Sequence, residues 1–192
     1  CGANSPKWQG RCPSCNSWNT YVEEVVDRPV PELLQKGRDT LRKEKAVPRL
    51  IQDIASEGVV RYPIPDPELS RVLGGGIVPG SVILLGGNPG IGKSTLLLQI
   101  AGLLKDTVLY VSGEESPEQL KLRANRIGGS GKKCYILPET RVSAILATAV
   151  QLETGLLIVD SVQTLYAEDV DSAPGSIAQI RATAFQLIRF AK

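Results

Sequence analysis

The run from Gly87 to Ser94 has the residue types and the spacing that hold a polyphosphate. It reads Gly-Asn-Pro-Gly-Ile-Gly-Lys-Ser and fits the pattern G-x-x-x-x-G-K-[ST] at every fixed position. Glycines let the backbone curl until its N–H groups point at phosphates, Lys93 brings a cation to the β- and γ-phosphates, and the Ser94 hydroxyl can ligate Mg²⁺. A glycine-rich turn beside a core helix is the alternative, but it does not need the Lys-Ser pair. The expected nucleotide contacts are Gly87, Asn88, Pro89, Gly90, Ile91, Gly92, Lys93, Ser94 and Thr95.

A second motif, which ends in a carboxylate, supports the first. Leu156 to Asp160 is four apolar residues followed by a carboxylate, which is the Walker B form. A strand buried on both faces reads as a continuous apolar run, and its carboxyl end opens at the crevice where α/β sheets bind ligands. We therefore expect Asp160 to hold Mg²⁺ together with Ser94, directly or through water. The alternative is a simple strand terminus.

The third chemical element is the pair Glu114 and Glu115, which follows a strand-like run and Gly113. Hydrolysis of a phosphoanhydride needs a base near the attacking water, and a carboxylate on the strand beside the phosphate-loop strand is well placed for that. Glu114 is the expected base, and with Lys93 and Asp160 it makes up the expected catalytic set. Glu115 is expected to be a charge that favours the start of the next helix, a role that either glutamate could fill.

Three of the four cysteines lie at the start of the chain. Cys12 and Cys15 form a C-x-x-C pair, and Cys1 precedes them. Two thiolates at this spacing can bind one metal ion from a tight turn, and zinc takes four ligands. The chain has no histidine, so we expect zinc on Cys1, Cys12 and Cys15 with a fourth cysteine just upstream. A redox pair is the alternative, but no thioredoxin-like pattern surrounds it. Cys134 is expected to be a core residue.

These residues require an α/β framework to bring them together. Apolar runs predict strands at about 81–86, 107–112, 133–137 and 155–160, and helices at about 93–104, 116–127, 141–152 and 175–191. The alternation predicts a mostly parallel sheet. We expect a small cysteine module at 1–24, a charged linker at 25–63 and an ATPase core at 64–192. In the cysteine module, Trp18 is expected to pack beside the metal.

Composition excludes little. The 192 residues are 42% hydrophobic and carry a net charge of +2, which neither requires nor excludes nucleic acid. No stretch has the length and apolarity of a membrane span, and no secretory signal is visible. The first residue is Cys rather than Met, so we expect that the natural N-terminus is missing and leave a removed targeting peptide open.

Five stretches together resemble the RadA/Sms family, which are DNA repair and recombination ATPases of the RecA/DnaB superfamily. The matching text is LGGGIVPGS at 73–81, GGNPGIGKST at 86–95, YVSGEES at 110–116, DSVQT at 160–164, and the cysteine-rich start. The resemblance implies a RecA-like P-loop core preceded by a zinc-ribbon-like module. It also implies segments beyond both ends, so the core is expected to be incomplete at its C-terminus.

The resemblance implies an ATP hydrolase that works on DNA. The expected function is an ATP-dependent recombination and repair motor of the branch-migration or helicase type, with ATP, Mg²⁺ and Zn²⁺ as cofactors. The expected partners are single-stranded or branched DNA, a RecA-type recombinase and further copies of the chain, in a cytoplasmic hexamer. A nucleotide-gated scaffold that binds DNA or recombinase without unwinding is the alternative. Residues 165–176 correspond to a DNA-facing loop in RecA-type ATPases, but they are acidic here and make a weak case for DNA contact.

Overall fold

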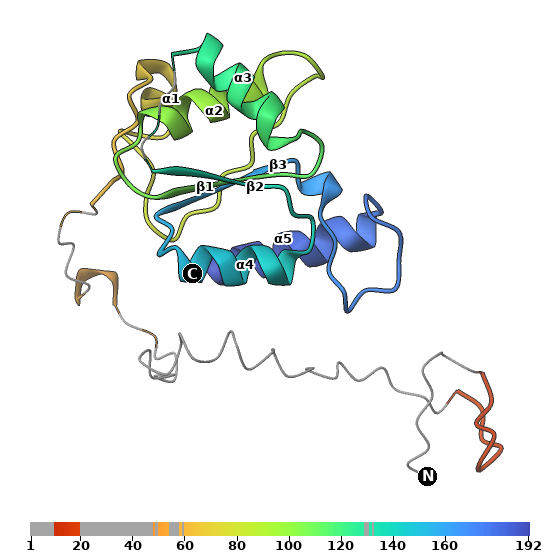
Figure 1. Ribbon diagram of the computed structural model, residues 1–192. Helices are drawn as coiled ribbons and strands as arrows, with labels where there is room; N and C mark the ends of the chain where they lie inside the picture. Colours follow the sequence, from red (N-terminus) through yellow and green to blue (C-terminus); the bar gives the residue numbers. More distant parts are fainter. Residues whose placement is uncertain are drawn as a thin grey trace. The chain divides into compact units, whose positions relative to one another are not determined.

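The computed structural model describes residues 10–19, 48, 50–53, 58, 60–128, 131 and 133–192. The chain divides into two compact units, residues 1–39 and 40–192, and each is described by itself (Figure 1). In the first unit, residues 10–19 form one tight turn closed by a bridge between Arg11 and Trp18. Residues 1–9, which include Cys1, and residues 20–47, which include much of the expected linker at 25–63, lie outside the described residues.

The second unit alternates helices and strands. Its elements are the 3-10 helix η2 (Ile51–Asp53), α1 (Pro67–Val72), α2 (Lys93–Leu103), β1 (Val108–Ser112), α3 (Pro117–Arg126), β2 (Cys134–Leu137), α4 (Val142–Gln151), β3 (Leu156–Asp160), the 3-10 helix η3 (Val162–Thr164) and α5 (Ile177–Ala191). The four long helices and the last three predicted strands are thereby confirmed. None of the helices in the described part of the chain has both the length and the apolarity needed to cross a bilayer.

The three strands form a parallel sheet in the order β2-β1-β3. Helices α2 and α3 cover one face and α4 and α5 cover the other, as Figure 1 shows. Because β1 is central and covered on both faces, all five of its residues are buried. The α/β fold class predicted from the sequence is therefore confirmed.

The core between the sheet and α2 and α3 places the candidate site. Side chains alternate between the two faces of a strand, so Val108 and Tyr110 share one face of β1. They join a buried cluster with Leu98 of α2, Leu120 of α3 and Ile158 of β3. This cluster fixes α2, whose first residues are the expected phosphate contacts, against the strands that carry the expected carboxylates. Cys134, expected in the core, packs partly buried against the same cluster, and burial raises the pKa of its thiol.

Local hydrogen bonds and a proline set the start of α3, the helix that follows the two glutamates. Ser116 and Gln119 form a reciprocal capping box, with each side chain accepting from the other's backbone N–H. Pro117 occupies the first turn, where its missing N–H costs nothing. The start of α3 is thus fixed directly after Glu115, and the preceding loop has little freedom in length.

The predicted strand at residues 81–86 is wrong. This stretch pairs with none of the described strands, and its apolar side chains are exposed, Val82 at 52% and Leu84 at 87%. A strand needs a neighbour that completes its hydrogen-bond ladder, and none of β1, β2 and β3 pairs with this stretch. Glu114 therefore does not follow a strand beside a phosphate-loop strand, because β1 lies between β2 and β3.

Candidate nucleotide-binding site

The backbone from Gly87 to Gly92, the expected phosphate loop, turns at two glycines with left-handed conformations. Gly90 and Gly92 have φ values of 76° and 103°, which side-chain-bearing residues rarely adopt. Gly92 is also the N-cap of α2, and no side chain there bonds the first-turn N–H groups. The helix therefore presents its N-terminal donors and its positive dipole end at the loop.

Lys93 lies over this loop as its first helical residue. Its ammonium Nζ donates to the carbonyl oxygens of Gly87 and Asn88, at 2.9 Å each. Residues 86–92 are solvent-exposed while Lys93, Ser94 and Thr95 are half-buried. The loop is thus an open cradle with a cation at its rim, and a phosphate group would replace carbonyls as the partner of the lysine.

A third side chain, Tyr110, contacts both residues that are expected to hold Mg²⁺. The hydroxyl of Tyr110 donates to Oδ2 of Asp160 at 2.7 Å and lies 3.5 Å from the carbonyl oxygen of Ser94. Burial first, and then the hydrogen bond to Asp160, raise the pKa of Tyr110 far above its ordinary value, so the phenol remains the proton donor. The structure therefore joins the first turn of α2 to the end of β3.

Glu114 lies beside the end of β3. Its Oε1 accepts a hydrogen bond of 3.2 Å from the hydroxyl of Ser161, the residue after Asp160. The backbone N–H of Gly113 donates to the carbonyl of Asp160 at 3.4 Å. The loop after β1, which carries Glu114, is therefore in contact with the end of β3, which carries Asp160.

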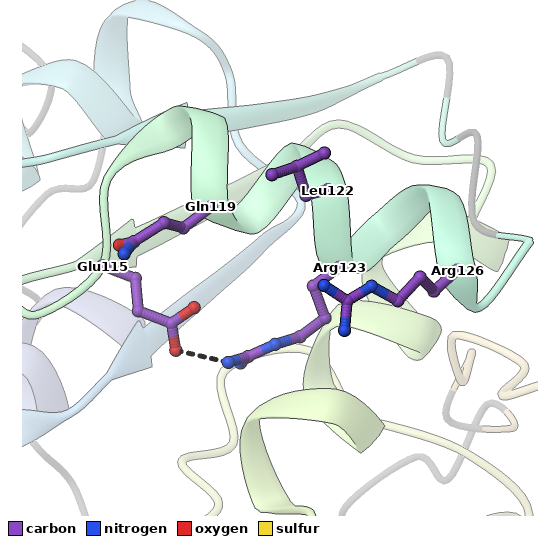
Figure 2. Close-up of a pocket in the computed structure, with 5 residues that line it drawn as sticks. All are labelled: Glu115, Gln119, Leu122, Arg123 and Arg126. Carbon is purple, nitrogen blue, oxygen red and sulfur yellow. Dashed lines mark ion pairs between the residues drawn. The ribbon is translucent and has the colours of Figure 1, made fainter.

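Glu115 has a different environment from its neighbour. Its carboxylate pairs with Arg123 of α3 at 2.8 Å, as Figure 2 shows, and its backbone N–H donates to the buried Ser112 hydroxyl at 3.0 Å. It directly precedes the N-cap Ser116, consistent with the expected helix-start charge. The shallow pocket in Figure 2 runs along α3 to Arg126 and includes no expected nucleotide contact. Glu115 thus anchors the loop, while Glu114 points to β3.

The segment after β3 is held by a buried glutamine. Gln179 of α5 is 2% exposed. Its Oε1 accepts from the N–H of Ala167 at 2.7 Å, and its Nε2 lies within 3.2 Å of the carbonyl oxygens of Ala167, Val170 and Ser172. The acidic stretch expected to correspond to a DNA-facing loop is therefore an ordered turn tied to α5.

These residues fit a nucleotide and its metal ion. The curled loop offers N–H donors and a lysine to phosphates, and the hydroxyl of Ser94 and the carboxylate of Asp160 are oxygen donors of the kind that Mg²⁺ prefers. Tyr110 connects the two elements that carry them. The donor set therefore suits Mg²⁺ better than a softer metal ion.

The described cysteine turn contains two of the four ligands that a zinc site requires, Cys12 and Cys15. Cys12 is buried and Cys15 exposed on one turn, in which Cys12 N–H donates to Ser17 and Asn16 N–H donates to Cys12. Among the described residues, no three metal-binding side chains come together. Cys1, the third expected ligand, lies outside them. Trp18, which was expected to pack beside the metal, is 69% exposed, with the Arg11 guanidinium 5.7 Å from its ring centre.

Comparison with known proteins places the chain in a family. A model described as an AAA domain matches residues 54–191, and one described as a rubredoxin metal binding domain matches residues 1–23. The first defines a nucleotide-hydrolysing ATPase class of domain.

The particular relatives carry one name. The DNA repair proteins RadA of Streptococcus pyogenes serotype M1, Listeria monocytogenes and Pseudomonas aeruginosa are 45%, 47% and 43% identical to this chain over its whole length. The chain therefore belongs to the AAA domain family of ATPases, and within it to the RadA/Sms type of the RecA superfamily. It spans 42% of the length of each of these relatives.

Two residues of the site were missed by sequence reasoning. Tyr110 reads as an ordinary apolar strand residue, and its partner Asp160 is 50 positions away. Arg123 reads as one of several charges on a helix surface. A tyrosine within an otherwise aliphatic buried strand is the one available signal, because a buried phenol needs a hydrogen-bond partner.

Proposed function

We propose that this chain binds and hydrolyses Mg²⁺-ATP at the loop 87–95 and that it is the nucleotide-binding part of an ATP-dependent DNA repair and recombination protein. One observation carries the proposal. Hydrogen bonds through Tyr110, Gly113 and Ser161 connect Asp160 with the loop that carries Glu114, and the phenol of Tyr110 also contacts the first turn of the loop helix. Such a group has the components that phosphoryl transfer requires: a phosphate cradle, a cation, a metal-binding carboxylate and a base.

Each residue has a separate task in this reaction. The backbone of Gly87 to Gly92 and the ammonium of Lys93 bind and orient the phosphates. Ser94 and Asp160 hold the metal ion, which when bound supplies charge neutralisation at the phosphate oxygens. Glu114 accepts the hydrogen bond of the attacking water and takes up its proton.

The DNA function rests on the relatives. Proteins named DNA repair protein RadA match along the whole of this chain, which supports a role of its ATPase in DNA repair. We propose an ATP-driven motor on single-stranded or branched DNA, built as a hexamer and working with a RecA-type recombinase. The scaffold alternative predicts no ATP-dependent strand displacement in the intact protein, and a directional unwinding assay separates the two.

The two neighbouring glutamates offer a matched test of the catalytic assignment. We expect Glu114→Gln to bind ATP with near-normal affinity and to hydrolyse it at least about a hundredfold more slowly, as loss of a general base predicts. Glu115→Gln, which alters a carboxylate paired with Arg123, should keep turnover within about threefold, since a partly exposed ion pair contributes little. Equal losses in the two variants would refute the assignment of Glu114 as base.

A further substitution tests the cradle itself. Lys93→Ala removes the cation that lies over the loop. We expect most ATP turnover to be lost in the intact protein, measured as phosphate release at saturating Mg²⁺. Unchanged turnover would refute the assignment of this loop as the phosphate site.

A further inference from the structure

The side chain of Tyr110 contacts both elements that carry the expected metal ligands. In the sheet register Tyr110 lies opposite Ile158, and Asp160 is two residues further along β3, on the same face. The phenol oxygen is 2.7 Å from Oδ2 of Asp160 and 3.5 Å from the carbonyl oxygen of Ser94. The distances make Asp160 the acceptor of the phenol proton and Ser94 a neighbour in contact.

The ring of Tyr110 is fixed by its surroundings. The residue is 0% exposed, on the central strand, and packs in the cluster that includes Leu98 of α2 and Leu120 of α3. Phenylalanine would supply the same apolar contacts, so packing alone gives no reason for the hydroxyl. A fixed ring turns its hydroxyl into a rigid donor, in contrast to a mobile side chain at the site's surface.

We propose that Tyr110 is a positioning residue for the metal site. Its hydroxyl holds Oδ2 of Asp160 and so restricts the carboxylate to one orientation, leaving Oδ1 for Mg²⁺ or for a water molecule in its shell. Hydrogen bonds of this kind to ligating carboxylates tune metal affinity without touching the metal. The inference rests on the proposed function, because it requires Asp160 to serve Mg²⁺.

The test is the Mg²⁺-dependent part of nucleotide binding in the intact protein. Calorimetry with ATPγS, with Mg²⁺ and with EDTA, gives the factor by which Mg²⁺ strengthens binding. We expect Tyr110→Phe to bind ATPγS in EDTA as the unaltered protein does. The factor by which Mg²⁺ strengthens binding should be about tenfold smaller in this variant. Tyr135→Phe, a half-exposed tyrosine on the neighbouring strand β2, should leave both values unchanged.

Two further variants separate the possible failures. Asp160→Asn should abolish most of the Mg²⁺ factor, and adding Tyr110→Phe to it should cause no further loss. If Asp160→Asn loses the factor but Tyr110→Phe keeps it, the positioning role is wrong while the metal assignment stands. If the losses of the two variants add, Tyr110 acts through general destabilisation and the proposal fails. If Asp160→Asn keeps the factor, the metal assignment of the proposed function fails, and the positioning role with it.

Discussion

The buried amide of Gln179 gives the sharpest prediction about the segment that follows β3. Gln179→Met keeps the length and apolar bulk of the side chain and removes four polar contacts with Ala167, Val170 and Ser172. Each net hydrogen bond is worth about 1 kcal/mol, and the buried N–H of Ala167 loses its acceptor. Part of this free energy is regained because the methionine side chain is apolar and remains buried. We expect a loss of about 3 kcal/mol in the free energy of opening this segment.

Hydrogen exchange measures that loss where it occurs. About 3 kcal/mol corresponds to roughly a hundredfold faster exchange of the amides in residues 165–176, if they exchange by local opening. Gln186→Met on the same helix is the control, because Gln186 is joined to Asp169 only by a 3.5 Å contact, and it should change exchange less than about threefold. Equal exchange rates in Gln179→Met and the unaltered protein would refute the view that this glutamine holds the turn.

Three further perturbations follow from the structure. Gly113→Ala places a Cβ against the side chain of Thr164, so chemical denaturation should show a loss of about 1–3 kcal/mol, and an unchanged midpoint would contradict the crowding. Arg141 lowers the pKa of Glu139 to about 2 from its usual 4.5. The free energy of unfolding of Glu139→Gln should therefore be lower than that of the unaltered protein above pH 4.5, and this difference should vanish as the pH falls towards 2. A difference in unfolding free energy that persists at pH 2 would contradict this. Chelation of zinc should make residues 1–24 sensitive to protease while 64–192 stay resistant, and unaltered cleavage would argue against the metal.

The helices and paired strands were predictable because their signals are local. The apolar runs at 108–112 and 156–160 lie between clear turn residues, and Ser116 with Pro117 marks the start of α3. The turn at residues 87–92 was predictable for the same reason, since its glycines are consecutive with the start of α2; its role as a phosphate site stays a prediction. Local sequence was therefore sufficient to predict the types of the elements and the turn at residues 87–92.

The predictions that failed or were missing depend on distant neighbours. The run 81–86 has the composition of a strand, but strand pairing depends on which other segment lies beside it. The bond between Tyr110 and Asp160 joins positions 50 apart, and only the register of β1 with β3 brings them together. Gln179 reads as a polar surface residue of an amphipathic helix, and its burial appears only once the turn folds over it.

The exposed apolar stretch from Val82 to Leu84 connects the binding of a covering surface with the affinity of the neighbouring loop for nucleotide. Only Leu85 and Gly86 separate it from the proposed phosphate loop, which begins at Gly87. Any surface that shields these side chains from water also immobilises the approach to the loop, and so reduces the ordering that a nucleotide must impose. If the loop binds ATP as proposed, a surface that covers this stretch raises the affinity for ATP, and by thermodynamic reciprocity bound nucleotide strengthens the binding of that surface.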